Sequence, residues 1–209
     1  MSSRRLRQST RASLPRHLRP VSDGSGYNHR PMSRSALIVI DMLNSYEHAD
    51  AEKLTRSVEE TLPAMERLIR RAADEDVPTI YVNDNFGAWN SDRDELLETV
   101  LAGEFAHLVK PIAPEDESLF VVKARHSIFY QTPLEFLLQQ HDVGRIVLIG
   151  QVTEQCVLYS ALDAYIRQLD VVVPRDAVAH IHAHLADAAL ELMEVNMSAE
   201  ICTADDCRF

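Results

Sequence analysis

The stretch "RIVLIGQVTEQCVLYSALDAY", residues 145–165, indicates how this chain folds. Its first six residues are mostly apolar and rich in β-branched side chains, which is typical of a strand covered on both faces of a parallel sheet. A short polar turn follows, and apolar residues then recur at helical spacing. A strand that runs directly into a helix is the building unit of an α/β fold, so we expect the rest of the chain to repeat it.

Short apolar runs do alternate with helical patterns from residue 35 onward. Helical spacing is clearest from Val58 to Ala72 and from Leu185 to Met193, and the less regular residues 85–118 predict one helix at about 92–102 between two loops. Strands are predicted at residues 36–42, 77–84, 119–123, 145–150, 170–174 and 199–202. The sequence therefore predicts a three-layer α/β/α fold around an open, mostly parallel, six-stranded, Rossmann-like sheet.

The N-terminal segment, residues 1–34, has a different composition from the rest. It holds eight arginines and one acidic residue, and Pro15 and Pro20 would interrupt any helix. We therefore expect a disordered basic arm. Its Arg- and Ser-rich composition also resembles an organelle transit peptide faintly, and Met32 is an alternative start of the protein.

Residues 35–209 predict one globular, acidic domain. They carry 13 basic and 31 acidic residues, a balance of −18, which argues against binding of nucleic acid. No apolar run approaches the ~18 residues of a membrane span, so we expect no membrane association. The three cysteines have no CxxC spacing, which favours a reducing compartment, and we expect a cytoplasmic protein.

Polar groups stand where the predicted strands end. The first strand ends near Asp41, the second at Asp84 and the third at Lys123, and the fourth runs into a turn that contains Cys156. Ligands of open parallel sheets bind beyond the carboxyl ends of the strands. We therefore expect these groups to meet at one edge of the sheet.

The residue types at this edge suit nucleophilic catalysis. If Thr153 caps the helix, Cys156 lies in its first turn, where unsatisfied N–H groups lower a thiol pKa and can also bind an oxyanion. Asp41 would move the protons, and Lys123 would keep carboxylate and thiol ionised. Each residue also has a structural alternative: a buried cysteine, an aspartate that caps a turn with Asn44, and a surface lysine.

Three blocks of the sequence resemble a known family. The segments "LIVIDMLNSY", "VVKARHSIFYQTPLEFLL" and "IGQVTEQCVLYSALDAY" are similar, in this order, to the signature blocks of the isochorismatase-like cysteine hydrolases. The likeness runs from about Ser35 to Thr203 and leaves out the arm. It implies an isochorismatase-like hydrolase domain over residues 35–209, a small-molecule substrate, no cofactor, and a homo-oligomer, either a dimer or a tetramer.

The resemblance also implies roles for single residues. Asp41 becomes the general acid and base, Lys123 its electrostatic partner and Cys156 the nucleophile. A cis peptide bond is implied between Gln151 and Val152, with the N–H groups of Val152 and Cys156 as the oxyanion hole. The implied reaction is hydrolysis of a C–N bond in a small amide, carbamoyl or ureido substrate through a thioester, which releases a carboxylate and ammonia or an amine.

Two departures from the family pattern affect the substrate pocket. Gln151 and Gln155 stand in a turn where the commoner sequence is closer to Gly-Val-Ala-Thr-Asp. Phe86 stands where nicotinamidases have the first histidine of an Asp-x-His metal site, so we expect no metal at Asp84. The residues predicted to line the pocket are Asn44, Tyr46, Asp84, Phe86, Trp89 and Phe129.

Other interpretations stay open at this point. The histidines at 180, 182 and 184 could bind a metal, but they follow a predicted strand and lead into a helix, which does not favour a common site. An isochorismatase-type vinyl ether hydrolase is one alternative function, and an inactive family member that serves as an oligomeric binding subunit is another. A nucleotide-binding Rossmann protein is disfavoured because no GxGxxG or GxxxxGK[ST] motif is present.

Overall fold

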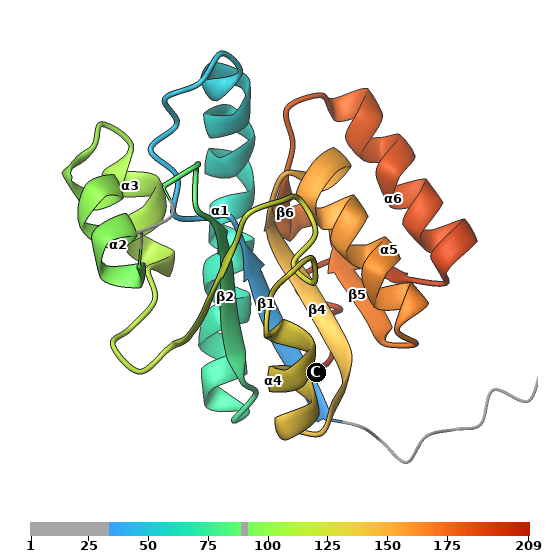
Figure 1. Cartoon of the computed structure of the whole chain (residues 1–209). Helices are drawn as coiled ribbons and strands as arrows, with labels where there is room; N and C mark the ends of the chain where they lie inside the picture. Colours follow the sequence, from blue (N-terminus) through green and yellow to red (C-terminus); the bar gives the residue numbers. More distant parts are fainter. Residues whose placement is uncertain (1–33, 89–91) are drawn as a thin grey trace, which may run out of the picture. The chain divides into compact units, whose positions relative to one another are not determined.

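The computed structural model describes residues 34–88 and 92–209 (Figure 1). The predicted arm lies outside the described residues except for Arg34, which begins the first strand. Six strands form a parallel sheet in the order β3-β2-β1-β4-β5-β7, and a seventh, β6, pairs with β4. The strands are β1 (Arg34–Ile40), β2 (Thr79–Asp84), β3 (Leu119–Lys123), β4 (Val143–Gln151), β5 (Asp170–Pro174), β6 (Val178–Ala179) and β7 (Glu200–Cys202).

The predicted fold class is confirmed, and each of the six predicted strands is present with its ends shifted by at most two residues. The structure also contains a short seventh strand, β6, which the sequence did not predict. Two residues are too few to give a period-2 or apolar-run signal, and this strand exists only because Gly150 and Gln151 at the end of β4 offer it a partner.

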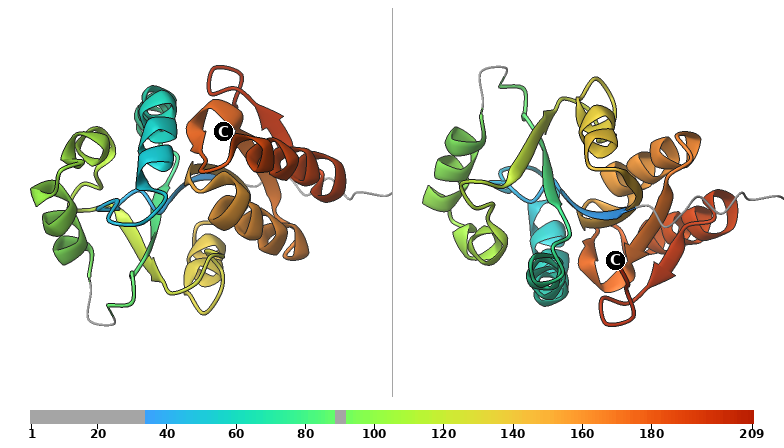
Figure 2. Two further views of the ribbon diagram at one scale, coloured as in Figure 1. Left: turned by 90° about the horizontal axis from the view of Figure 1, so that it is seen from above. Right: turned by 90° about the horizontal axis from the view of Figure 1, so that it is seen from below.

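Helices cover both faces of this sheet. In Figure 2, α1 (Ala51–Asp74) lies on one side of the strands, and α4 (Leu134–Gln140) and α5 (Leu158–Ile166) lie on the other. None of the described helices is both long and apolar enough to cross a membrane. The remaining helical elements are α2 (Arg93–Ala102), α3 (Ala106–Val109), α6 (Ala183–Met197), a π-helical turn at Thr153–Val157, and 3-10 turns at Lys110–Ile112 and Arg175–Ala177.

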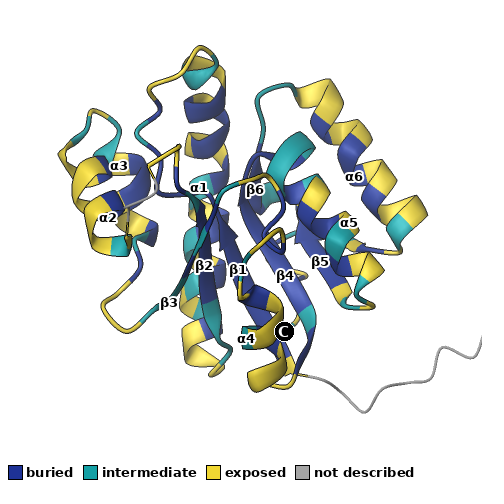
Figure 3. Ribbon diagram, viewed as in Figure 1, coloured by how far each residue is buried: buried dark blue, intermediate teal, exposed yellow. Residues whose placement is uncertain are grey.

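The alternation of side chains along β1 divides the core into two layers. Ile38 and Ile40 pack in the layer under α4, α5 and α6, while Leu37 and Val39 pack in the layer under α1. All four side chains are at most 1% exposed, and Figure 3 shows the buried strands between helices whose outer faces are exposed. Helices cover both faces of β1, so its side chains are not accessible to a ligand. Asp41, the polar residue that follows β1, is the first one along this chain segment that a ligand can contact.

Gly150 allows the ends of β1 and β4 to approach closely. It pairs with Ile40 in the parallel register, and its φ is 112°, in the left-handed half of the map that side chains rarely adopt. A Cβ atom at this position would lie 2.2 Å from the backbone oxygen of Ile40. Any other residue would therefore push apart the two strands that carry Asp41 and Cys156.

We expect Gly150→Ala to destabilise the fold. The added methyl group clashes with backbone, which cannot rotate away, and the positive φ adds strain, so the free energy of unfolding should fall by about 3 kcal/mol or more. Urea denaturation followed by circular dichroism measures it. Gly103→Ala, whose Cβ would stay 3.4 Å from its nearest neighbour, is the matched control and should change stability much less. Equal effects of both substitutions would contradict the proposed role of Gly150.

Candidate active site

Two carboxylates, an ammonium and a thiol meet at the carboxyl edge of the sheet. The Nζ of Lys123 lies 2.8 Å from Oδ2 of Asp41, 3.4 Å from Oδ2 of Asp84 and 3.5 Å from the Sγ of Cys156. The thiol of Cys156 is also hydrogen-bonded to the carboxylate of Asp41. Of the four residues that the sequence placed at this edge, Lys123 thus contacts each of the other three.

Asp41 is fixed by backbone and side-chain contacts. It follows β1 with a φ of 55°, and its Oδ1 accepts a hydrogen bond of 2.7 Å from the backbone N–H of Asp84. The side-chain amide of Gln151 donates to the backbone oxygen of Asp41 at 2.5 Å, and the Gln151 side-chain oxygen accepts from the hydroxyl of Tyr46 at 3.3 Å. One Asp41 oxygen remains for Lys123 and the other is held by β2, so the carboxylate has a single orientation.

Lys123 is a buried cation. Its side chain is 0% exposed, which excludes the alternative of a surface lysine. Burial lowers the pKa of Lys123, but its interactions with Asp41, Cys156 and Asp84 raise the pKa by more, so the pKa is raised overall and the group stays protonated. For Asp41, burial is the larger effect. It raises the carboxyl pKa more than Lys123 lowers it, so the pKa of Asp41 is also raised.

Cys156 lies in a π-helical turn, and the predicted capping of this turn is wrong. The residue at the N-cap position is Val152, and the hydroxyl of Thr153 donates to the backbone oxygen of Ala179 at 2.9 Å instead of capping the helix. The peptide bond between Gln151 and Val152 is cis, at the place that the family resemblance implies. The wider π turn begins directly after this bond and carries Cys156 toward Lys123.

The carboxylate of Glu154 ties this turn to the neighbouring loop. Its Oε1 accepts hydrogen bonds from the backbone N–H groups of Ile181 and His182, at 3.1 and 2.7 Å. Neither Glu154 nor the amide of Gln151 was predicted from the sequence as a support of the site. Gln151 and Glu154 each form hydrogen bonds to residues that are distant along the chain, and a local sequence pattern does not predict such contacts.

The prediction that the site lowers the pKa of the Cys156 thiol is also wrong. Burial raises the pKa of Cys156, and the adjacent negative charge of Asp41 raises it further, while Lys123 lowers it by a smaller amount. Lys123 already forms ion pairs with the carboxylates of Asp41 and Asp84, so a thiolate would be a third anion beside a single cation. This balance favours the neutral thiol, so attack by the sulfur requires a base that removes its proton.

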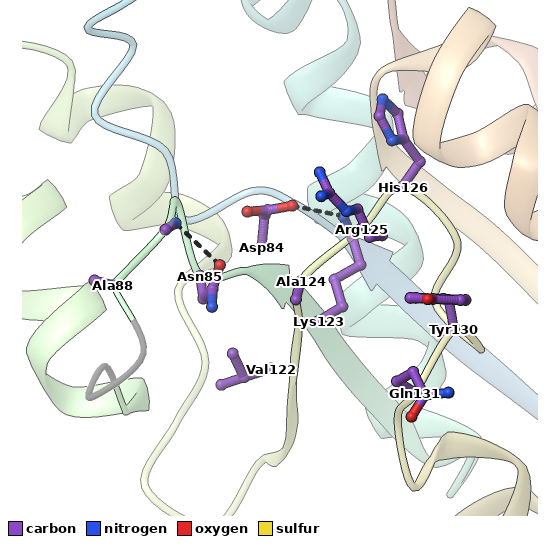
Figure 4. Close-up of a pocket in the computed structure, with 11 residues that line it drawn as sticks. Asp84, Asn85, Ala88, Val122, Lys123, Ala124, Arg125, His126, Tyr130 and Gln131 are labelled. Atoms are coloured by element: carbon purple, nitrogen blue, oxygen red, sulfur yellow. Dashed lines mark hydrogen bonds and ion pairs between the residues drawn. The ribbon is translucent and has the colours of Figure 1, made fainter.

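A cavity of about 960 Å³ opens beside this cluster (Figure 4). Asp84 and Lys123 are among the residues that line it, whereas Asp41 and Cys156 are not. A second cavity, of about 400 Å³, shares Arg125, His126 and Tyr130 with the first. The other residues of the first cavity are Asn85, Gly87, Ala88, Val122, Ala124 and Gln131.

Of the predicted pocket residues, Asp84 lines the large cavity. Asn44 and Tyr46 are buried supports: the Asn44 side-chain oxygen accepts from the backbone N–H of Tyr46 at 2.7 Å, and Tyr46 is 2% exposed. Phe86 is 54% exposed, and its N–H donates to Asp84 Oδ1 at 2.8 Å. Trp89 lies outside the described residues.

Phe129 belongs to the core and not to a cavity wall. Its side chain is 5% exposed, and the guanidinium of Arg167 lies 4.7 Å from its ring centre. The sequence predicted Phe129 as a residue that lines the pocket. The chain turns after β3, however, so that Arg125, His126 and Tyr130 face the cavities while Phe129 packs against α5.

The three alternate histidines have separate neighbours. His180 Nδ1 lies 3.1 Å from the hydroxyl of Ser57, and His182 Nδ1 lies 3.7 Å from Glu154. The rings of His182 and His184 are 6.2 Å apart. Within residues 34–88 and 92–209, no group of three or more histidine, cysteine or acidic side chains is arranged to hold a metal ion.

Comparisons with known proteins match this architecture. A family model described as the isochorismatase domain matches residues 35–206. The uncharacterized isochorismatase family protein YaaI of Bacillus subtilis (strain 168) is 33% identical over 170 residues, which cover 81% of this chain and 94% of that protein. N-carbamoylsarcosine amidase of Arthrobacter sp. is 25% identical over 166 residues, 73% of this chain and 61% of that protein. The crystal structure of a cysteine hydrolase from Pseudomonas syringae pv. phaseolicola 1448A has the same fold, with a TM-score of 0.68 and 21% identity over 83% of this chain and 90% of that one.

We expect Asp41→Asn to speed alkylation of Cys156 at neutral pH. Removal of the carboxylate charge removes one cause of the raised thiol pKa and leaves Lys123 as the nearest charge, so the thiolate fraction increases. Each pKa unit recovered raises the thiolate fraction about tenfold, and the reaction with iodoacetamide speeds up by less than this because a less basic thiolate is a weaker nucleophile. The rate is measured at about pH 7.5 by mass spectrometry of the peptide that contains Cys156.

Asp94→Asn, at an exposed position on α2, is the matched control and should leave this rate unchanged. Slower alkylation in Asp41→Asn than in the wild type would show that Asp41 promotes the thiolate in the resting protein, which contradicts this charge balance.

Proposed function

The chain belongs to the isochorismatase family, and we propose that it is a cysteine-dependent hydrolase that cleaves the C–N bond of a small amide, carbamoyl or ureido substrate. The observation that carries the proposal is the contact of one thiol, that of Cys156, with both Asp41 and the ammonium of Lys123. This arrangement supplies a nucleophile, a group that moves its proton and a charge that stabilises either anion. The relative that is named an N-carbamoylsarcosine amidase supports the same class of reaction.

The first half of the reaction forms a thioester. The Cys156 proton passes to Asp41 as the sulfur attacks the substrate carbonyl carbon, and the oxygen of the tetrahedral intermediate accepts from the N–H groups of Val152 and Cys156. Asp41 then returns the proton to the nitrogen as the C–N bond breaks, and ammonia or an amine leaves. The raised pKa of Asp41 suits this exchange because a more basic carboxyl accepts the thiol proton more readily.

The second half hydrolyses the thioester. A water molecule enters the place that the amine has left, gives a proton to Asp41 and attacks the acyl carbon. The C–S bond breaks, the sulfur recovers the proton from Asp41, and the product leaves as a carboxylic acid that loses its remaining proton to water to become the carboxylate. Lys123 touches both Asp41 and Cys156, so its charge stabilises the anion on oxygen or on sulfur throughout.

The alternative of a vinyl ether hydrolase is less well supported. Family members that cleave vinyl ethers do so without a cysteine nucleophile, whereas this chain places Cys156 in hydrogen-bonding distance of the buried ion pair. An inactive binding subunit is likewise a poorer account, because a buried lysine shared by two carboxylates is costly to maintain for packing alone.

We further propose that the protein forms a homo-oligomer. The outer face of α5 exposes Tyr159, Leu162 and Ile166, which are spaced at i, i+3 and i+7 and are 47%, 42% and 65% exposed. Phe136 of the neighbouring α4 is 63% exposed. A group of apolar side chains on one face is typical of a surface that a second subunit covers.

We expect Cys156→Ala to abolish turnover. Loss of the nucleophile should lower kcat by about 10⁴-fold or more, because no other group can form the thioester. Ammonia release from a panel of primary amides, carbamoyl amino acids and ureido acids measures it. Cys202→Ala, at a half-buried cysteine outside the site, is the matched control and should keep wild-type activity. Turnover of the preferred substrate by Cys156→Ala would refute the mechanism.

We expect Ile166→Glu to dissociate the oligomer. The charge would be buried in the interface without a partner, which weakens association strongly. Sedimentation velocity of the purified protein gives the mass of the species in solution. Leu101→Glu on α2, where the native side chain is 39% exposed, is the control and should leave the mass unchanged. A monomeric wild-type protein would contradict the proposed assembly.

A further inference from the structure

Two cysteines that the proposed reaction does not use lie beside each other near the end of the chain. Cys202 is the last residue of β7, and Cys207 follows it after a short turn. Their thiols are hydrogen-bonded to each other. Both side chains pack in the core layer under α1, where Cys207 is 0% exposed and Cys202 is half-buried. A disulfide forms from two adjacent thiols, so this pair is a candidate site of oxidation.

The turn between the two cysteines is closed by its own hydrogen bonds. The backbone N–H of Cys207 donates to the backbone oxygen of Thr203 at 2.9 Å. The hydroxyl of Thr203 donates to Oδ2 of Asp206 at 2.7 Å and accepts from the backbone N–H of Asp206 at 3.3 Å. The reduced protein therefore already holds the two thiols side by side, which lowers the conformational entropy that is lost when a disulfide closes.

Neighbouring elements fix this turn in place. Arg71 of α1 donates to the backbone oxygens of Ala204 and Cys207, at 3.1 and 2.9 Å. The backbone N–H of Ala204 donates to Oδ1 of Asp176, which follows β5, at 2.7 Å. Because α1 and the segment after β5 both hold the turn, Cys207 stays in the core next to Cys202. The third cysteine, Cys156, is engaged by Lys123 at the carboxyl edge of the sheet.

We propose that Cys202 and Cys207 form a site of reversible oxidation, at which a hydroperoxide converts the two thiols into an intramolecular disulfide. The sulfur of Cys202, the more exposed of the two, attacks one peroxide oxygen. The O–O bond breaks, and with hydrogen peroxide one water leaves and Cys202 becomes a sulfenic acid. The sulfur of Cys207 then attacks the sulfur of Cys202, the S–O bond breaks, and the hydroxyl group leaves with the Cys207 proton as a second water. Two thiols are oxidised and one peroxide is reduced, independently of the proposed hydrolysis.

The surroundings of the pair make this oxidation slow at neutral pH. Burial raises the pKa of the Cys202 thiol to about 12, and Cys207 and Glu200 add to the increase. Burial also raises the pKa of Cys207, although the positive charge of Arg71 opposes it. The thiolate is the form that attacks the peroxide, so the rate should rise by about tenfold for each pH unit above 7 until the pH approaches the pKa. The pair therefore responds to sustained oxidation and not to a brief exposure.

The test counts thiols after exposure to peroxide. The protein is incubated with millimolar hydrogen peroxide at about pH 8.5 and then unfolded in urea with N-ethylmaleimide, which alkylates each remaining thiol. Cys202 and Cys207 lie in one tryptic peptide, residues 176–208, and Cys156 lies in another, residues 146–167. Peptide 176–208 should lose two hydrogen atoms and take up no maleimide. Dithiothreitol added before the maleimide should restore both thiols.

Two variants separate this pair from the third cysteine. Cys156→Ala should form the disulfide at the wild-type rate, because the active-site thiol takes no part in it. Cys202→Ser should form none, and its Cys207 should take up maleimide after unfolding. The inference would be overturned if both thiols of the wild type survived the exposure or if Cys202 were oxidised to a sulfinic or sulfonic acid. A disulfide from Cys202 to Cys156 or to a second molecule would overturn it too.

Thermal unfolding gives a second readout of the same bond. A disulfide between residues 202 and 207 restricts the unfolded chain, so the oxidised protein should have a Tm about 2–6 °C above that of the reduced protein. Dithiothreitol should remove the increase, and peroxide-treated Cys202→Ser should not show it. An oxidised protein that melts below the reduced one would show that the bond distorts the turn, which contradicts a site that the native fold already holds ready.

Discussion

A single buried ammonium, that of Lys123, determines how the carboxyl edge of this sheet is built. It contacts Asp41 from β1, Asp84 from β2 and Cys156 from the turn after β4, so the ends of four strands converge on one positive charge. A lysine without its partners in this position would cost several kcal/mol, and each carboxylate would be equally unfavourable without the lysine. The edge is therefore stable only when all of these strands end in register.

The register depends on the backbone contact between β1 and β4. Ile40 and Gly150 are paired, and only a glycine leaves room for the two chains at this point. Asp41 follows directly after Ile40, and the amide of Gln151, the residue after Gly150, holds the backbone oxygen of Asp41. A shift of one residue would turn Asp41 to the opposite face of the sheet and separate it from Cys156. The same pairing of β1 with β4 therefore packs the two strands and aligns Asp41 with Cys156.

Most of the fold could be predicted from the sequence because strands covered on both faces leave a strong apolar signal. The carboxyl-edge rule for parallel sheets also predicted that Asp41, Asp84, Lys123 and Cys156 would meet. The details of the thiol could not be predicted. A π turn replaces the expected capped helix, and the raised thiol pKa follows from a charge balance among four side chains that no single segment contains. The pocket was predicted least well, because the direction of Arg125, Tyr130 and Phe129 is set by the turn after β3.

The neutral thiol is an advantage for the proposed chemistry. The site holds one cation and has room for two anions beside it, which are the carboxylates in the resting protein. When the Cys156 proton moves to Asp41, the negative charge moves from oxygen to sulfur, and Lys123 is in contact with both atoms. The net charge of the buried cluster does not change, so the transfer requires no rearrangement of the surrounding protein to solvate a new ion. A lysine that touched only the thiol would favour a permanent thiolate and leave Asp41 without the proton that the departing amine needs. The position of Lys123 between the two groups therefore favours a proton that moves back and forth between Cys156 and Asp41.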